Sequence, residues 1–354
     1  MRYILVGIVA LFVAGSAAQQ ARQAQEAPQP QLAPQMFTNP LLPSGADPWI
    51  VSRDGFYFYM QTTGNNLTIW KTRNVGSLAT AEKKVVWTPP ATGPYSHEIW
   101  APELHYLADK WYIYFAADDG RNETHRIWVL ENASPDPLAG EWTMKGKASD
   151  PTDRWAIDAT VFEHKGQLYL AWSGWPGDHD GEQDIYFARL KDPWTVDGGR
   201  VRISSPRQPW EKHGDLPGPR HVNVNEGPEL LEHGNSMFLV YSASGCWTDD
   251  YELGMLRAQA DADVLKPSSW RKSNKPVFTG SPDAHAYGAG HNGFFKSPDG
   301  KEDWIVYHAN PEPHEGCGTH RSPRAQPFAW NADGTPDFGR PVPLGRPIPK
   351  PSAR

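Results

Sequence analysis

The sequence contains five copies of one pattern, and this repetition constrains the fold more than any other feature. Each copy has an extended segment, a tight turn and a strand rich in aromatic and β-branched residues. The copies are ADPWIVSRDGFYFYMQT from Ala46, WAPELHYLADKWYIYFAAD from Trp100, IDATVFEHKGQLYLAWSG from Ile157, NEGPELLEHGNSMFLVYSAS from Asn225 and GHNGFFKSPDGKEDWIVYHAN from Gly290. Turns such as the one at Asp54 and Gly55 suit a positive φ, so each copy is expected to form a β-hairpin.

The copies recur at intervals that suit a ring of sheets. The second residues of the copies are Asp47, Ala101, Asp158, Glu226 and His291, which are 54, 57, 68 and 65 residues apart. Each interval can hold a four-stranded sheet, the unit that β-propellers repeat around a central channel. We therefore predict an all-β fold, a five-bladed β-propeller over residues 37–350. A β-sandwich is the alternative, and a parallel α/β fold is disfavoured because no stretch shows convincing helical periodicity.

The composition agrees with short strands joined by turns. The 354 residues include 16 Trp, 13 Tyr and 13 Phe, which favour strands, with 32 Gly and 34 Pro, which favour turns. The formal net charge is −7, and the sequence has no basic run. Binding of a phosphate backbone needs clustered cations, so we expect no nucleic-acid partner.

The N-terminus has the parts of a secretory signal peptide over residues 1–18. A charged start at Arg2 precedes an apolar run that ends in small residues at Ala18. The run is about 12 residues long, whereas a membrane-spanning helix needs about 20, so we predict export and no membrane anchor. The destination would be extracellular or periplasmic. Residues 19–36 are rich in Gln, Ala and Pro and are predicted to be a tether, and we expect a monomer.

The two cysteines, Cys246 and Cys317, leave two interpretations open. An exported protein can form a disulfide, and a bridge here would join residues 71 positions apart. Separate burial of two thiols is equally compatible with the sequence, because spacing alone does not show that the cysteines approach each other.

Equivalent positions on the innermost strands of a propeller face one channel. Three of the five aligned residues are carboxylic acids, so three carboxyl groups are expected to converge. Like charges in one low-dielectric cavity resist simultaneous ionisation, which favours a functional site. An acid and a base in a pocket lined by Trp and Tyr are typical of glycoside hydrolysis. A Ca²⁺ or Mg²⁺ centre is the alternative, but no dense acidic loop supplies the roughly six oxygens that it needs.

The motifs at these positions resemble those of glycoside hydrolase family 43. They are ADP at Asp47, HEIWAPELH from His97, AIDATVF around Asp158, NEGPEL around Glu226 and AGHNGFF around His291. They follow the family's order over nearly all of residues 37–345. The resemblance implies a five-bladed propeller that hydrolyses arabinose- or xylose-containing oligo- or polysaccharides and needs no cofactor for the chemistry. The runs HEIWAPELH, CWTDDYELG and RSPRAQPF look most like the secreted α-L-arabinofuranosidases of this family.

The resemblance also implies catalytic roles. Asp47 would be the general base that activates water, and Glu226 would be the general acid that protonates the leaving oxygen. Asp158 would orient the acid and raise its pKa. In an inverting hydrolase the acid and base lie about 6.5–9.5 Å apart so that water fits beneath the sugar, and the first and fourth blades could provide this span.

Further residues are implied to bind substrate or metal. Trp100 resembles a residue that lines the sugar pocket, and Arg321, preferred over Arg324, resembles an arginine near the sugar. His291 resembles a channel histidine that in some members holds a structural Ca²⁺, directly or through water. Three further tryptophans could be sugar platforms or core residues: Trp172, Trp175 and Trp247.

The choice of sugar stays open at this level. Endo-arabinanases, β-xylosidases and galactofuranosidases of the same family are alternatives, because loop shape discriminates between such sugars. Two segments are candidates for closing one side of the pocket, Gly177 to Gln183 and Trp210 to His221. A non-catalytic carbohydrate-binding propeller is the alternative from another class, but it would not need three carboxyl groups at matched positions.

Overall fold

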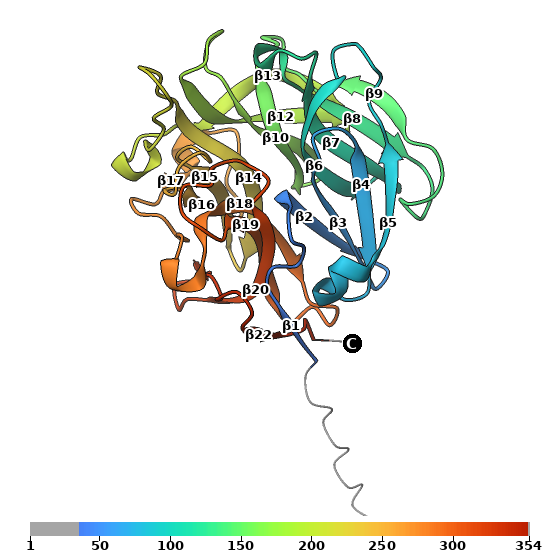
Figure 1. The fold of residues 1–354 in the computed structure, drawn as a ribbon. Helices are drawn as coiled ribbons and strands as arrows, with labels where there is room; N and C mark the ends of the chain where they lie inside the picture. Colours follow the sequence, from blue (N-terminus) through green and yellow to red (C-terminus); the bar gives the residue numbers. More distant parts are fainter. Residues whose placement is uncertain (1–34, 353–354) are drawn as a thin grey trace, which may run out of the picture. The chain divides into compact units, whose positions relative to one another are not determined.

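Within residues 35–352, the part of the chain that the computed structural model describes, nearly all regular structure is β-strand (Figure 1). The predicted signal peptide and almost all of the predicted tether lie outside these residues. Five short 3-10 helices interrupt the strands: η1 (Val75–Thr80), η2 (Asn122–Thr124), η3 (Pro209–Glu211), η4 (Pro267–Ser269) and η5 (Pro282–Ala284). No helix in the described range is long and apolar enough to cross a lipid bilayer.

Consecutive strands pair into five antiparallel blades of four strands. The first blade is β2 (Ala46–Arg53), β3 (Phe56–Thr62), β4 (Leu67–Thr72) and β5 (Glu82–Trp87). The second is β6 (His97–Leu107), β7 (Lys110–Asp118), β8 (Arg126–Asn132) and β9 (Thr143–Lys147). The third is β10 (Ala156–His164), β11 (Gln167–Gly174), β12 (Glu182–Asp192) and β13 (Thr195–Ser204). The fourth is β14 (Asn223–His233), β15 (Ser236–Ala243), β16 (Glu252–Gln259) and β17 (Arg271–Lys272). The fifth is β18 (Tyr287–Lys296), β19 (Asp303–Asn310), β20 (Ser322–Trp330) and β21 (Pro336–Asp337).

The innermost strands form a closed ring, which confirms the predicted five-bladed propeller. Each of β2, β6, β10, β14 and β18 contacts the next, and β18 contacts β2. The third and fourth blades are also joined by a short parallel pairing of β12 with β14, in which Gln183 faces Val224. Hairpin turns set the pairing within blades: Asp54 and Gly55 both have positive φ, of 52° and 76°, as a two-residue turn between twisted strands requires.

The two ends of the described chain close the ring between the first and fifth blades. Strand β1 (Met36–Thr38) pairs with β22 (Pro347–Pro349), and the two lie side by side in Figure 1. The side chain of Asn39 exchanges two hydrogen bonds with the backbone of Ala325 on β20. Phe37 and Ile348 are buried in the cluster between these blades. The first and fifth blades are therefore held together by both ends of the chain.

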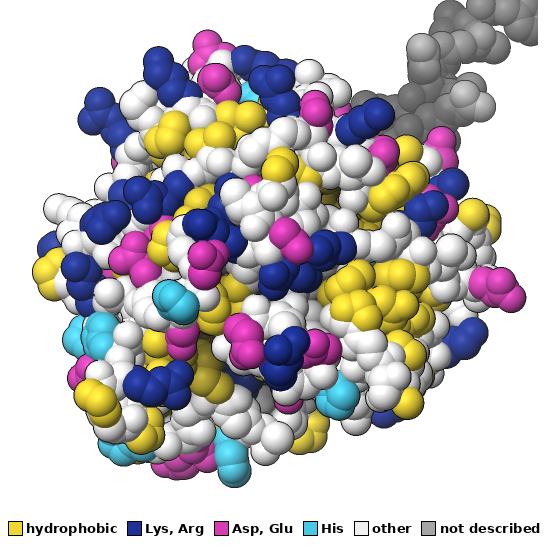
Figure 2. Space-filling model, turned by 90° about the horizontal axis from the view of Figure 1, so that it is seen from above, with side chains coloured by type: hydrophobic (Ala, Val, Ile, Leu, Met, Phe, Trp, Pro, Cys, Tyr) yellow, Lys and Arg dark blue, Asp and Glu magenta, His cyan; other side chains and the backbone are white. Residues whose placement is uncertain are grey.

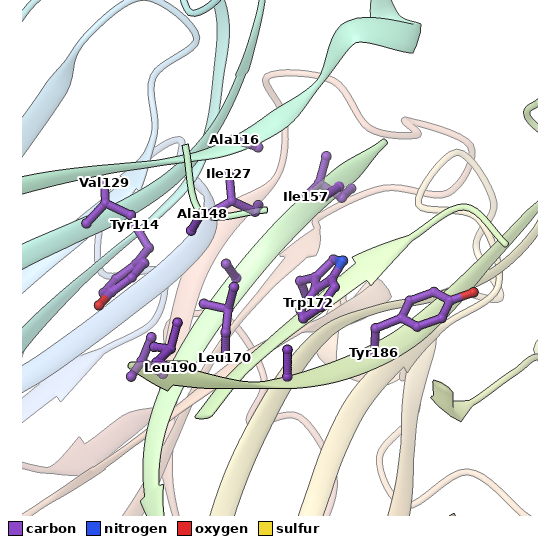
Figure 3. Packing of buried hydrophobic residues seen from close by; sticks show 14 of the residues in the cluster. Tyr114, Ala116, Ile127, Val129, Ala148, Ile157, Leu170, Trp172, Tyr186 and Leu190 are labelled. Atoms are coloured by element: carbon purple, nitrogen blue, oxygen red, sulfur yellow. The ribbon is translucent and has the colours of Figure 1, made fainter. Parts of the chain in front are cut away.

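The hydrophobic core lies between neighbouring blades rather than in one centre. Figure 3 shows the cluster between the second and third blades, where Tyr114 and Val129 of one sheet face Leu170 and Trp172 of the other. Trp172 is buried, and its ring packs between the sheets. Trp172 is therefore a core residue and not a platform for the sugar.

Charged side chains of both signs are interspersed on the face of the molecule that Figure 2 shows, and hydrophobic side chains appear between them. This face carries no continuous basic patch of the kind that binds a phosphate backbone.

Candidate active site

Each innermost strand leaves its regular ladder near its start, where a bulge re-aims the side chains. The residues at the bulge have left-handed backbone conformations, with φ of 54° at Asp47, 42° at Ala101, 55° at Asp158, 53° at Gly227 and 51° at His291. Such conformations cost a non-glycine residue about 1–3 kcal/mol and are typical of functional sites.

Glu226 does not occupy the position that the aligned repeats gave it. It pairs with Ser242, so it lies one residue before the bulge, and Gly227 occupies the slot of Asp47 and Asp158. The alignment was wrong because it matched the acidic residues. Matching Pro228 with the prolines that follow Asp47 and Ala101 would have given the observed register.

Glycine at position 227 suits the left-handed backbone of this bulge. A Cβ there would make an ordinary van der Waals contact of 3.4 Å with the imidazole of His291, so the φ of 53°, rather than lack of space, favours glycine. At this bulge the carboxyl group is supplied by the preceding residue, Glu226, and the histidine of the next blade lies beside the glycine.

The six residues singled out from the sequence line one pocket with a volume of about 430 Å³. They are Asp47, Asp158, Glu226, Trp100, Arg321 and His291. This volume lies within the usual range for small-molecule sites. The three carboxyl groups therefore converge as predicted, although Glu226 reaches the pocket from a different register.

Asp47 is surrounded by donors. Its Oδ2 accepts a hydrogen bond of 2.5 Å from the Thr62 hydroxyl, and its Oδ1 lies 3.2 Å from Nδ1 of His291 and 3.4 Å from Nη1 of Arg321. Its backbone N–H donates to Nδ1 of His308 at 3.0 Å. Burial opposes ionisation of Asp47, but His291, Arg321, His308 and Thr62 outweigh it and hold its pKa well below the usual range.

Among these neighbours, Arg321 carries the lasting positive charge. Burial lowers the pKa of His291 and lowers that of His308 further, so both imidazoles are neutral near pH 7. The guanidinium of Arg321 is therefore the cation that favours the ionised form of Asp47 at neutral pH.

Glu226 is held in the opposite state. Burial is the largest cause that raises its pKa to about 7; the Asp47 carboxylate also raises it, whereas a 2.9 Å hydrogen bond from the Tyr251 hydroxyl and the charge of Arg321 lower it. We expected Asp158 to raise this pKa, but burial and the Asp47 carboxylate raise it, and the charge interaction between Glu226 and Asp158 instead raises the pKa of Asp158. The pocket thus combines an ionised carboxylate with a carboxyl group that stays mostly protonated up to about neutral pH.

Asp158 lies beside this acid on the innermost strand of the third blade. Its Oδ2 accepts the backbone N–H of Gly227, the residue after Glu226, at 3.1 Å. Burial raises its pKa well above the usual range, and the negative charges of Glu226 and Asp47 raise it further. Asp158 is therefore bonded to the backbone that carries Glu226.

Polar residues on the second strands of neighbouring blades support the bulges, and the motifs considered above did not predict them. The Thr62 hydroxyl accepts the N–H of Ala101 at 2.7 Å, and the Ser242 hydroxyl accepts the N–H of His291 at 2.8 Å. His308 does the same for Asp47. These residues occupy one position in the copies, at the ends of MQT, VYS and VYH, so aligning the second strands would have found them.

Aromatic rings form part of the pocket wall. Trp100 stacks on His125, with ring centres 4.1 Å apart, and its Nε1 donates to Glu98 at 2.9 Å. Trp175 lines the pocket and stacks on Trp155, which sequence analysis missed, with centres 4.9 Å apart. Trp247 also lines the pocket. Trp247 thus belongs to the site, and Trp175 belongs both to the pocket wall and to the buried cluster between the second and third blades.

Both candidate loops contribute side chains to the pocket, whereas only one of the two candidate arginines, Arg321, lines it. Asp180 and Gln183 of one loop and Leu216 and Arg220 of the other line the pocket, and Arg220 forms an ion pair of 3.2 Å with Asp180. Arg324, by contrast, is fully buried, and its guanidinium donates to backbone carbonyl groups.

A metal site is not formed by the side chains around His291. Over residues 35–352, no three His, Cys, Asp or Glu side chains lie in an arrangement that could hold a metal ion. Nδ1 of His291 instead lies beside the Asp47 carboxylate. The donor set falls short of the oxygen-rich shell that Ca²⁺ prefers, so these residues do not fit the Ca²⁺ that the family resemblance implied.

Comparisons with known proteins identify the family of the chain. Residues 37–336 match the model of glycosyl hydrolases family 43. The chain is 41% identical over 315 residues to an extracellular exo-α-(1→5)-L-arabinofuranosidase of Streptomyces avermitilis, covering 86% of this chain and 64% of that protein. It is 39% identical to the enzyme of the same name from Streptomyces chartreusis, covering 87% of this chain and 90% of that one.

A solved structure shares the fold. The crystal structure of an α-L-arabinofuranosidase from Lactobacillus brevis superposes with a TM-score of 0.81 at 36% identity, and the match covers 88% of this chain and 98% of that one. With a family match over most of its length and a carboxyl-lined pocket at the centre of a five-bladed propeller, the chain belongs to glycosyl hydrolases family 43.

Proposed function

We propose that the protein is a secreted, inverting glycoside hydrolase that releases L-arabinofuranose from arabinan or from arabinose-decorated plant polysaccharide. The observation that carries this proposal is the pairing, in one pocket, of a carboxylate held ionised at Asp47 with a carboxyl group held protonated at Glu226. The arabinofuranosidase names of the relatives supply the sugar.

In the proposed reaction Asp47 removes a proton from a water molecule as the water oxygen attacks the anomeric carbon. The bond from that carbon to the leaving oxygen breaks, and Glu226 gives its proton to this oxygen. The attacking oxygen enters opposite the leaving group, so the anomeric configuration inverts. Both carboxyl groups exchange their protonation states and are reset by solvent.

The remaining residues position the sugar and the acid. Asp158 would hold the strand segment that carries Glu226 through the N–H of Gly227. Trp100 presents an indole to the pocket, a surface on which the apolar face of a sugar stacks. Arg321 would keep Asp47 ionised and donate to sugar hydroxyl groups.

Loop side chains in the pocket support exo action as the more specific form of the proposal. The segments around Asp180 and Arg220 line the pocket and meet in an ion pair, and we infer that this contact limits the room for a polymer chain to pass through. No observation of comparable specificity favours the alternatives. These are an endo-arabinanase, a β-xylosidase, a galactofuranosidase and a carbohydrate-binding module without catalysis.

The proposal extends to the whole chain. We propose that residues 1–18 direct export and are removed, that residues 19–36 tether the propeller of residues 37–350, and that the protein acts as a monomer outside the cytoplasm. Mass spectrometry of the secreted protein, with an N-terminus at residue 19, and light scattering at the mass of one chain would test these points.

A substrate panel tests the activity. Among aryl α-L-arabinofuranosides, β-xylosides and galactofuranosides, only the arabinofuranoside should give a sharp response. Branched or debranched arabinan should release arabinose in the same panel. Proton NMR should show the free sugar appearing first with inverted configuration. Release of xylose alone, or a product of retained configuration, would contradict the proposal.

A further inference from the structure

The two cysteines form a disulfide that joins two blades at the mouth of the pocket. Cys246 lies between β15 and β16 of the fourth blade, and Cys317 lies between β19 and β20 of the fifth. Both line the pocket that holds Asp47 and Glu226. A bridge placed there bears directly on the geometry of the site.

The guanidinium of Arg321 is aimed mainly by the segment that carries Cys317. Its Nη2 donates to the carbonyl oxygen of Cys317 at 2.6 Å, and its Nε donates to the carbonyl oxygen of Gly318 at 3.3 Å. Only its Nη1 contacts Asp47, at 3.4 Å. Two of these three contacts therefore depend on where the backbone of residues 317–318 lies.

That backbone is poorly held by regular structure. Residues 311–321 form turns and bends between two strands. Gly316 has a φ of 63°, and a further glycine follows Cys317. Hydrogen bonds also reach the segment from outside: the buried side chain of Asn310 donates to the carbonyl of Gly316 at 2.9 Å, and the N–H of Gly45 donates to the carbonyl of Arg321 at 2.8 Å. The contacts of Ser44 with the carbonyl of Thr319 and of Asp249 with the N–H of His314 involve exposed groups. None of these bonds is made to the carbonyl of Cys317 itself. The carbonyl of Cys317 accepts the shortest hydrogen bond of Arg321, and the disulfide attaches Cys317 covalently to the fourth blade.

We propose that the Cys246–Cys317 disulfide is a positioning device for catalysis, which fixes the Cys317 carbonyl so that Arg321 stays aimed at Asp47. Cys246 and Cys317 are thus positioning residues, whose effect on the reaction passes through the arginine. This inference rests on the proposed hydrolase function.

The charge of Arg321 gives the proposal a signature in the pH profile. The guanidinium favours the ionised forms of Asp47 and Glu226 and lowers the pKa of both. When the arginine is no longer held, the pKa of the general acid rises, so the alkaline limb of kcat/KM moves to higher pH. A general loss of stability would lower the amount of active protein without moving that limb.

The test is a cycle of four proteins: wild type, the double variant Cys246→Ser/Cys317→Ser, Arg321→Gln, and the combination. With an aryl α-L-arabinofuranoside, removing the bridge should lower kcat/KM by about tenfold in the wild-type background and by less than about threefold when Arg321 is already gone, because coupled residues are not additive. Equal fractional losses in both backgrounds, or no loss in either, would overturn the proposal.

A matched control separates positioning from stability. Ile348→Ala empties a buried site in β22, which takes no part in lining the pocket. It should lower the thermal midpoint while leaving kcat/KM per folded molecule and the pH profile unchanged. If the double serine variant does not fold, reduction of the folded wild type and of Arg321→Gln by a thiol reagent, with counting of free thiols, replaces it and has the same expected outcomes.

A crystal structure of the double variant tests this inference independently of the proposed hydrolase activity. Displacement of the Arg321 guanidinium from Asp47 supports it even if the substrate panel finds no arabinofuranosidase activity. An arginine that keeps its contacts to the Cys317 carbonyl and to Asp47 without the bridge would refute it, whatever the enzyme hydrolyses.

Discussion

The hydroxyl group of Tyr251 donates a hydrogen bond of 2.9 Å to Oε1 of Glu226. The tyrosine is buried, and its ring stacks on His308, whose Nδ1 accepts the backbone N–H of Asp47. One stacked pair of rings therefore touches the proposed acid on one side and the proposed base on the other. Changes to this pair should move the ionisation of the site without removing either carboxyl group.

Replacing Tyr251 with Phe should move the alkaline limb of the pH profile upward. The tyrosine hydroxyl stabilises the charged form of Glu226, so its loss raises the pKa of that acid above its value of about 7. Because the acid works when protonated, activity should persist to higher pH. The measurement is kcat/KM against pH, with Tyr112→Phe, which alters a hydroxyl outside the pocket, as the control. A limb that stays in place or moves downward would count against the assigned acid.

Asp47→Asn and Glu226→Gln should each lower kcat by about 10²- to 10⁴-fold, the usual contribution of a general base or acid, while circular dichroism and sugar binding remain normal. The two variants should differ with leaving group. Dinitrophenolate leaves without a proton, so the Glu226 variant should recover much of its rate on a dinitrophenyl arabinofuranoside, and the Asp47 variant should not. Near-normal turnover by both variants would exclude these roles.

Trp100→Ala and Trp172→Ala should separate a sugar platform from a core residue. Trp100 lines the pocket, so its loss should raise KM by roughly two- to tenfold with little change in thermal midpoint, as expected for about 0.5–1.5 kcal/mol of lost stacking. Trp172 is packed between two blades, and its loss should destabilise the fold by about 3–5 kcal/mol. Thermal unfolding and initial-rate kinetics on both variants provide the check, and the reverse pattern would refute the assignment.

Removal of divalent cations should leave activity intact. Nδ1 of His291 lies beside the Asp47 carboxylate, and the surrounding side chains do not make a Ca²⁺ shell. Dialysis against EDTA should therefore change neither kcat/KM nor the thermal midpoint. A loss that Ca²⁺ restores, and that His291→Gln abolishes, would show that the channel holds an ion through water molecules.

The repeats predicted the fold because each hairpin is local. The turn residues, the aromatic strands and the spacing all lie within about 60 residues of sequence, so the five blades and the convergence of Asp47, Asp158 and Glu226 followed from one aligned pattern. The register of Glu226 was not predicted correctly. The alignment matched Glu226 with Asp47 and Asp158 because all three are acidic, whereas Gly227 is the residue with the equivalent backbone position at the bulge.

The supporting residues were missed because the copies were aligned on their first strands alone, which leaves out Thr62, Ser242 and His308. Tyr251 lies in a loop of the same blade as Glu226, outside the aligned pattern, whereas His308 reaches Asp47 from the fifth blade, 261 positions away in the sequence. Contacts between blades follow only from the closed ring. The cysteine pairing was undecided for the same reason: only the closed ring brings the fourth and fifth blades' loops together.

Ala101 has the same left-handed backbone as Asp47, Asp158 and His291, yet it carries no functional group. The unusual conformation is therefore inherent to the blade and exists whether or not chemistry makes use of it. Proteins with this fold therefore have five equivalent backbone positions around one axis. At a position that carries no functional side chain, such as Ala101, one substitution can introduce an acid, a base or a ligand into the channel without a change in the backbone.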